Sequence, residues 1–210
     1  DLFTSAIIGL LIALLILYAG YIISKPKKWK FENSIDHEKE ILSHLNTYHG
    51  KVLSHLIFLH DKYIFWNSKK NVLISFQQYA DKLVILGDPI GEKSELSHAI
   101  EEFQEISDRY GYTPVFYQVS DDMLPYLHGN GYTLFKLGGE VSKYAFVSEK
   151  IAAQIYLHGN EVYPFQDLRE FKEKYTNNWE SKYLGYRRKS KFSLPLTMTQ
   201  ITLLISKRRI

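Results

Sequence analysis

Apolar and polar positions divide the chain into an uninterrupted apolar run near the N-terminus and a longer part in which helix-like and strand-like segments follow one another. Residues 2–23 contain no charged residue. From residue 36 onward, apolar positions recur first at helical spacing and then in short runs bounded by turn-forming residues. The expected elements, in chain order, are a helix over 36–49, strands over about 55–66, 72–79 and 82–86, a helix over 95–110, a strand over 113–119, a short helix and turn over 121–131, and a strand over 132–137.

This order predicts an α/β fold with a mixed sheet. The three strands separated by short turns indicate an antiparallel meander, and the later strands, each reached through a helix, indicate crossover connections. Ser94 is expected to cap the long helix and Gly111 to end it, while Gly50 is expected to end the first helix.

The apolar run is long enough to cross a bilayer, because 22 residues at about 1.5 Å per residue match a hydrocarbon core of about 30 Å. A signal peptide fits less well, since no basic residue precedes the run, and a buried helix is the remaining alternative. We therefore expect a transmembrane helix at 1–24 and a basic juxtamembrane linker at 25–35. Because the first residue is Asp1 rather than Met, we expect a piece of a larger membrane protein. The linker carries lysines that predict a cytoplasmic side and contacts with anionic headgroups, namely Lys25, Lys27, Lys28 and Lys30.

Composition shows that the chain can build a core and that its charge is unevenly spread. Apolar residues make up 45% and aromatic residues 15%, and the absence of cysteine excludes disulfides and thiolate metal sites. The eight histidines are irregularly spaced, so no metal site is predicted. Residues 31–141 carry 9 Lys and Arg against 16 Asp and Glu, whereas residues 142–210 carry 13 against 6. The basic tail predicts an anionic partner, either a nucleic acid or a lipid surface.

The stretch Gly-Asp-Pro-Ile-Gly at 87–91 stands between a strand and the long helix, where many enzymes bind a phosphate. A phosphate loop needs free backbone N–H groups and no nearby negative charge. Here Asp88 and Glu92 flank the turn, and Pro89 has no N–H group. We therefore expect a rigid structural corner and no coenzyme A binding at this place.

Two basic clusters in the tail are candidates for binding anions. Each cluster is either a solvent-exposed basic surface without a partner or a binding site for the phosphate groups of RNA or lipid. The apolar segment 194–210 is too short to span a membrane, and a docked terminal helix is favoured over an interfacial one. The cations of interest are Arg169, Lys172 and Lys174 in the first cluster and Arg187 and Arg188 in the second.

Several longer stretches resemble the multiple peptide resistance factor (MprF) family of phosphatidylglycerol lysyltransferases. They are LVILGDPIGE, YGYTPVFYQVSDDMLPYLHGNGY, FKLGGE and IYLHGNEVYPFQDLREFKEKYTNNWESKYLGY. The order of elements is also similar to the acetyltransferase-type (GNAT) fold, in which the strand before the long helix and the next strand splay apart. The family resemblance implies a multi-helix flippase followed by a synthase of two GNAT-like domains.

The resemblance also implies an aminoacyltransferase of bacterial cell membranes, with its soluble domain on the cytoplasmic side. Such enzymes esterify an amino acid, here most simply lysine, from aminoacyl-tRNA to phosphatidylglycerol, which gives resistance to cationic antimicrobial peptides. Aminoacyl-tRNA is then the co-substrate, no coenzyme A is needed, and copies can associate through the membrane part. The Phe-Lys-x-x-aromatic motif at 171–175 implies that Lys172 stabilises negative charge during transfer. Arg169, Lys174, Arg187 and Arg188, from the two basic clusters, are the candidates for contacts to the tRNA.

At one place the chain departs from the family. After Leu-Gly-Gly-Glu at 137–140 the family continues into most of a second GNAT-like domain, which carries an Asp-x-x-Arg motif. No such motif occurs between Val141 and Phe165. We therefore expect a first GNAT-like domain at 36–141 and a C-terminal remnant of the second at 142–210. Two hypotheses follow, an aminoacyl-tRNA-dependent enzyme or a non-catalytic module that binds tRNA, lipid or another copy.

Overall fold

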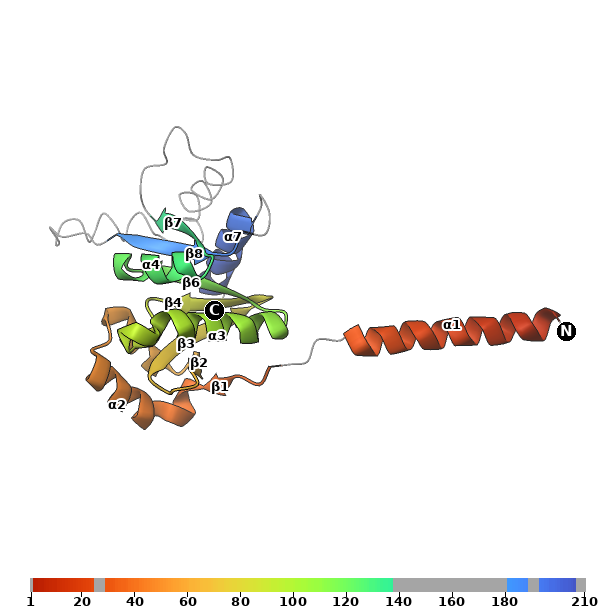
Figure 1. Cartoon of the computed structure of the whole chain (residues 1–210), viewed down its shortest axis with the longest axis horizontal. Helices are drawn as coiled ribbons and strands as arrows, with labels where there is room; N and C mark the ends of the chain where they lie inside the picture. Colours follow the sequence, from red (N-terminus) through yellow and green to blue (C-terminus); the bar gives the residue numbers. More distant parts are fainter. Residues whose placement is uncertain (1, 25–28, 138–180, 189–192, 207–210) are drawn as a thin grey trace, which may run out of the picture. The chain divides into compact units, whose positions relative to one another are not determined.

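The computed structural model describes residues 2–24, 29–137, 181–188 and 193–206. The chain divides into two compact units, Asp1–Lys30 and Phe31–Ile210. The first unit contains helix α1 (Leu2–Ser24), whose sequence has neither charged residues nor proline to interrupt it (Figure 1). Within the described ranges, no helix combines the length and the apolar character that a membrane crossing requires. The predicted span at 1–24 is therefore not confirmed.

The second unit is built around one mixed sheet with the strand order β1-β2-β3-β4-β6-β8-β7, and β5 pairs with β3 beside this path. Strands β4 and β6 are parallel, and the other neighbouring pairs among the described strands are antiparallel. This arrangement confirms the predicted α/β class with a mixed sheet. The strands are β1 (Glu32–Asn33), β2 (Tyr63–Trp66), β3 (Val72–Tyr79), β4 (Lys82–Leu86), β5 (Ile90–Gly91), β6 (Thr113–Val119), β7 (Thr133–Leu137) and β8 (Lys182–Tyr186).

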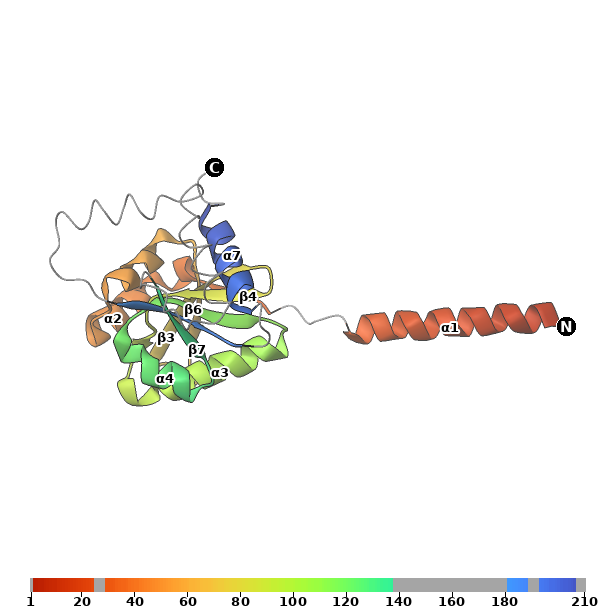
Figure 2. The same ribbon diagram turned by 90° about the horizontal axis from the view of Figure 1, so that it is seen from above.

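Helices cover both faces of the sheet (Figures 1 and 2). Phe103 of the long helix packs on Phe76 of β3 with ring centroids 5.2 Å apart, which fixes that helix to one face. On the other face, Met198 of the terminal helix packs with Val84 of β4. The described helices of the second unit are η1 (Ser34–His37), α2 (Glu38–Tyr48), η2 (Val52–Leu59), η3 (Lys93–Glu95), α3 (Leu96–Arg109), η4 (Asp121–Met123), α4 (Leu124–Gly129) and α7 (Ser193–Ser206), of which η1 to η4 are 3₁₀ segments.

The strands are buried on both faces because successive side chains alternate between the two helix layers. In β3, Phe76 meets α3, whereas Leu73 packs in a cluster with Ile41 of α2 and Ile57 of η2. The central strands therefore read as nearly continuous apolar runs, and this is why their positions were readable from the sequence.

Most of the expected elements are present, and strands 72–79, 82–86 and 113–119 have the predicted bounds. The strand expected over 55–66 is wrong in its first half, because Val52–Leu59 forms a 3₁₀ segment that ends at His60, whose φ is 57°. The expected cap at Ser94 is also wrong, since this residue lies inside η3 and the helix proper begins at Leu96. His49, with φ of 50°, takes the left-handed position that was expected of Gly50.

Strands β4 and β6 do not splay apart over the described pairing, which corrects the expectation taken from the GNAT resemblance. They pair from Lys82–Thr113 through Leu86–Tyr117. The Gly87 N–H group then donates to the Tyr117 carbonyl at 2.8 Å, so the pairing continues into the corner. The irregularity lies instead between β6 and β8, where Gln118 forms a bulge with φ of 59°.

The described part of residues 142–210 joins the same sheet as residues 36–137. Strand β8 lies between β6 and β7 and pairs antiparallel with both. Helix α7 docks on that sheet through Leu194, Met198 and Ile201, which are buried. The expectation of a docked terminal helix is confirmed.

Candidate functional site

The corner at 87–91 is closed by its own hydrogen bonds. Besides the bond of Gly87 to Tyr117, the Glu92 N–H group donates to the Asn71 carbonyl at 3.0 Å. A Cβ atom on Gly91 would overlap the Asn71 carbonyl group, so the backbones approach too closely for any larger residue. These N–H groups are already used by carbonyl oxygens, which supports the interpretation as a structural corner.

Asp88 of this corner is the centre of a polar cluster formed by Lys51, Asp88, Ser120 and Asp122. Its carboxylate accepts hydrogen bonds from the Ser120 N–H group at 2.8 Å and from the Ser120 hydroxyl at 2.7 Å. The Lys51 ammonium lies 2.9 Å from Asp88 and donates to the Ser120 hydroxyl at 2.7 Å and to Asp122 at 3.1 Å. The cluster thus joins the start of η2, the corner after β4 and the loop after β6.

The contact between Lys51 and Ser120 resembles a nucleophile beside a base, but its electrostatics oppose that role. Burial alone would lower the pKa of Lys51, yet the hydrogen bonds and charges of Asp88 and Asp122 raise it overall. A lysine held in its charged form cannot take a proton from a serine hydroxyl. We therefore interpret the cluster as structural and call it the latch, because its hydrogen bonds and ion pairs connect three segments of the chain.

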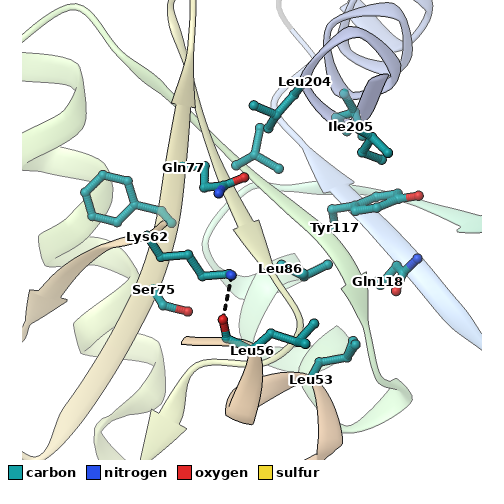
Figure 3. A pocket seen from close by; sticks show the side chains of 13 residues that line it. Leu53, Leu56, Lys62, Ser75, Gln77, Leu86, Tyr117, Gln118, Leu204 and Ile205 are labelled. Atoms are coloured by element: carbon teal, nitrogen blue, oxygen red, sulfur yellow. Dashed lines mark hydrogen bonds between the residues drawn. The ribbon is translucent and has the colours of Figure 1, made fainter. Parts of the chain in front are cut away.

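A pocket of about 270 Å³ lies on the sheet face that η2 and α7 cover (Figure 3). Its floor is made by β3, β4 and β6, and its walls by η2 and α7. The lining is mainly apolar, with a polar side near β3. The apolar lining residues are Leu53, Leu56, Phe76, Val84, Leu86, Tyr117, Ile201, Leu204 and Ile205, and the polar ones are Lys62, Ser75, Gln77 and Gln118.

Two polar residues of the pocket are unusual. Lys62 is only 5% exposed, and its ammonium donates to the Leu56 carbonyl and to Asp61, both at 2.7 Å. Gln118 holds a left-handed backbone conformation in the β6 bulge, which costs a non-glycine residue on the order of 1 kcal/mol. Bulges of this kind often redirect a side chain at a functional site. The pocket is thus the strongest candidate site among the residues that the structure describes.

Few of the residues predicted from sequence can be compared with this pocket. Lys172, Arg169 and Lys174 lie outside the described residues, as do Lys25, Lys27 and Lys28. Lys30 is described and exposed, and it belongs to the first compact unit.

Of the second basic cluster, Arg187 lies at the end of β8, where its Nη1 donates to both carboxylate oxygens of Asp108 at 2.6 Å. Arg188 is exposed. Neither arginine lines the pocket. Their assignment to tRNA contacts stays a prediction, and for Arg187 the structure adds a role in fastening β8 to α3.

The pocket could not be predicted from the sequence, because its lining comes from segments that are far apart in the chain. Lys62 and Gln118 could have been noticed only as polar residues inside otherwise apolar runs. Within the described ranges, no group of three or more His, Asp or Glu residues is arranged to hold a metal ion.

The sequence profile of the family "Phosphatidylglycerol lysyltransferase, C-terminal" matches residues 43–142 and 140–186. The two matches meet at residues 140–142, next to the Leu-Gly-Gly-Glu stretch after which a departure from the family is expected. The phosphatidylglycerol lysyltransferase of Staphylococcus aureus strain MRSA252 is 38% identical over 113 residues, which are 54% of this chain and 13% of that protein. The enzyme of strain COL is 35% identical over 137 residues, which are 65% of this chain and 16% of that protein.

A solved structure supports the fold. The structure of L-PGS from Bacillus licheniformis superposes with a TM-score of 0.67 over 85% of this chain and 99% of that chain, at 23% identity. The chain aligns to only about one sixth of the length of its curated relatives, namely 16% of the strain COL enzyme. The family profile nevertheless covers well over half of the chain, and the chain belongs to the phosphatidylglycerol lysyltransferase C-terminal family.

Proposed function

We propose that this chain takes part in the transfer of an aminoacyl group, in the first instance lysyl, to phosphatidylglycerol. The observation that carries the proposal is the family match over residues 43–142 and 140–186. The curated relatives bear the name phosphatidylglycerol lysyltransferase, which denotes a transferase that uses a lipid. The chain is expected to work at the membrane surface, where this lipid lies, and the lysines at 25–30 favour the cytoplasmic side.

The proposed donor is aminoacyl-tRNA. In this reaction the glycerol hydroxyl of the lipid attacks the ester carbonyl, a new ester bond forms, and the bond to the tRNA ribose breaks. The proton of the lipid hydroxyl ends on the released ribose hydroxyl, so no oxidant, reductant or coenzyme A is required. An oxyanion develops on the carbonyl, and a fixed cation lowers its free energy. Lys172 is proposed for this role on the strength of its motif at 171–175.

A GNAT-like fold is part of the same proposal. The described order of α2, three antiparallel strands, α3 and a parallel strand supports it. The modified lipid carries less negative charge, so resistance to cationic antimicrobial peptides is the expected consequence. Association of copies through the N-terminal part belongs to the same proposal.

A non-catalytic role is the second candidate, and one observation in the sequence favours it. The chain lacks an Asp-x-x-Arg motif between Val141 and Phe165. In that case the chain binds tRNA, lipid or another copy without transferring the aminoacyl group.

An assay with radiolabelled lysyl-tRNA and phosphatidylglycerol vesicles separates the two candidates. The enzyme produces labelled lysyl-lipid from the full chain, and phosphatidylcholine vesicles serve as the control. Binding of tRNA or vesicles without any labelled lipid would establish the non-catalytic role instead.

Within an active chain, Lys172→Ala should lower the transfer rate about 10²-fold or more, the usual effect of removing one oxyanion donor. Lys174→Ala is the matched control, because a phosphate contact changes the apparent affinity for tRNA rather than the rate at saturation. Unchanged lysyl-lipid production by the Lys172→Ala variant would remove this lysine from the mechanism.

A further inference from the structure

We infer that the pocket between η2 and α7 holds one acyl chain of the phospholipid, while the headgroup stays outside it; this inference rests on the proposed function. The lining of the pocket is the first argument. Nine of the lining residues are aliphatic or aromatic, and they come from both walls and the floor. A site of this composition gains its binding free energy from the burial of apolar surface.

The size of the pocket is the second argument. Sites for drug-sized molecules measure roughly 300–1,000 Å³. A volume of about 270 Å³ is therefore suited to a single narrow chain. A diacylglycerol with its headgroup would not fit.

The third argument is that the polar side of the pocket does not favour a phosphate group. Lys62 is the charged residue among those that line the pocket. Its ammonium donates to the Leu56 carbonyl (Figure 3) and also to the Asp61 carboxylate. The charge of Lys62 is thus compensated inside the protein. A phosphate in this pocket would lose its hydration without gaining an uncompensated cation.

The two walls of the pocket also present apolar side chains to the outside. Leu59 at the end of η2 is 61% exposed, and Leu203 on α7 is 45% exposed. Such residues favour contact with a membrane surface at the walls through which a lipid chain would enter.

The test uses the natural absence of cysteine, which allows a single thiol to be placed in the pocket wall. In the Leu204→Cys variant of the full chain, the rate of alkylation by a small maleimide is measured with and without soluble, monomeric lipids. The Leu203→Cys variant is the matched control, because its side chain is the exposed neighbour on the same helix. The probes are hexanoyl and octanoyl lysophosphatidylglycerol, octanoyl lysophosphatidylcholine and glycerophosphoglycerol, which has no acyl chain.

The lysolipids should protect the Leu204→Cys variant and leave the Leu203→Cys variant unchanged. Each buried methylene contributes about fourfold in affinity, so the octanoyl probe should protect at about one fifteenth of the concentration of the hexanoyl probe. Octanoyl lysophosphatidylcholine should protect nearly as well, because the pocket recognises the chain. Adding Ser75→Leu, which fills the floor of the pocket, should weaken protection at least tenfold.

Two results would overturn the inference. One is protection by glycerophosphoglycerol, which would place the headgroup in the pocket; the other is protection that does not depend on chain length. The transferase assay is run in parallel on the unmodified chain, so that a failure of the acyl-chain site can be distinguished from a failure of the proposed function. Lysyl transfer without protection refutes the acyl-chain site and leaves the function standing. Protection without transfer supports the site and counts against the function.

Discussion

Removing the carboxylate of Asp88 should destabilise the folded chain by about 3 kcal/mol. The Asp88 side chain is only 10% exposed, and it accepts hydrogen bonds from the backbone N–H group and the hydroxyl of Ser120. Hydrogen bonds to a charged group contribute about 1.5–3 kcal/mol each, and the two here share one carboxylate, so their effects do not add fully. The Asp88→Ala variant also leaves the Ser120 N–H group without this acceptor.

The ion pair with Lys51 should contribute much less. The Lys51 side chain is 48% exposed, and an ion pair of such a group is screened by solvent to about 0–1 kcal/mol. The Lys51→Ala variant is therefore the matched control. Asp88→Asn should lie between the two at about 2 kcal/mol, because it keeps an acceptor for the Ser120 N–H group but turns an amide NH₂ toward the hydroxyl and the ammonium.

Urea unfolding followed by circular dichroism measures these differences. With a slope of about 2 kcal/mol per molar urea, a loss of 3 kcal/mol moves the midpoint down by about 1.5 M. The cycle formed by Asp88→Ala and Ser120→Ala should give a coupling energy above about 1 kcal/mol. If Asp88→Ala costs no more than Lys51→Ala, the corner is not held by these hydrogen bonds and the latch interpretation is refuted.

Three further predictions concern buried groups. Burial lowers the pKa of His44, and this effect outweighs the opposing effects of the Ile90 hydrogen bond and the charge of Glu40. The free energy of unfolding should therefore not depend on His44 above about pH 6.5. Below this pH it should fall, because His44 takes up a proton in the unfolded chain but not in the folded one. The slope should be at most about 1.4 kcal/mol per pH unit, and a His44→Gln variant that kept it in denaturant titrations would contradict this assignment. Tyr132→Phe should leave stability unchanged or raise it by about 1 kcal/mol in thermal unfolding, because the buried hydroxyl has no hydrogen-bond partner among the described residues; a loss above 1 kcal/mol would show a missed partner. Gly91→Ala should cost at least about 3 kcal/mol through overlap with the neighbouring strand, whereas Gly111→Ala, with open space around it, should cost about 1 kcal/mol for its φ of 78°; equal losses would refute the close approach.

The central strands could be predicted from the sequence because their signals are local. Strands β3 and β4 are apolar runs bounded by turn residues, and both were found with their observed bounds. The segment 55–66 shows where this reasoning fails. Its first part is as apolar as a strand, yet the chain forms a 3₁₀ segment that places Ile57 in the core and leaves Leu59 exposed. Local hydrophobicity does not distinguish these two ways of burying one side of a short segment.

Long-range features could not be predicted, because they depend on segments that are far apart in the sequence. From the sequence, Asp88 could be interpreted only through its negative charge, which disfavours phosphate binding. Its partners Lys51 and Ser120 lie 37 and 32 residues away along the chain. The lining of the pocket likewise comes from η2, three strands and α7. The insertion of β8 between β6 and β7 was missed for the same reason, since a five-residue strand carries no sign of its neighbours.

The position of β8 has a consequence for synthesis of the chain on the ribosome. Strands β6 and β7 each pair with β8, which is the last of the described strands to be synthesised. Until residue 186 has left the exit tunnel, the facing edges of β6 and β7 expose unpaired backbone groups that can pair with other chains. The sheet therefore cannot be completed in the order in which its strands are synthesised. Folding must wait for its longest-range pairing, so nascent chains that stall before β8 should be prime substrates for chaperones and proteases.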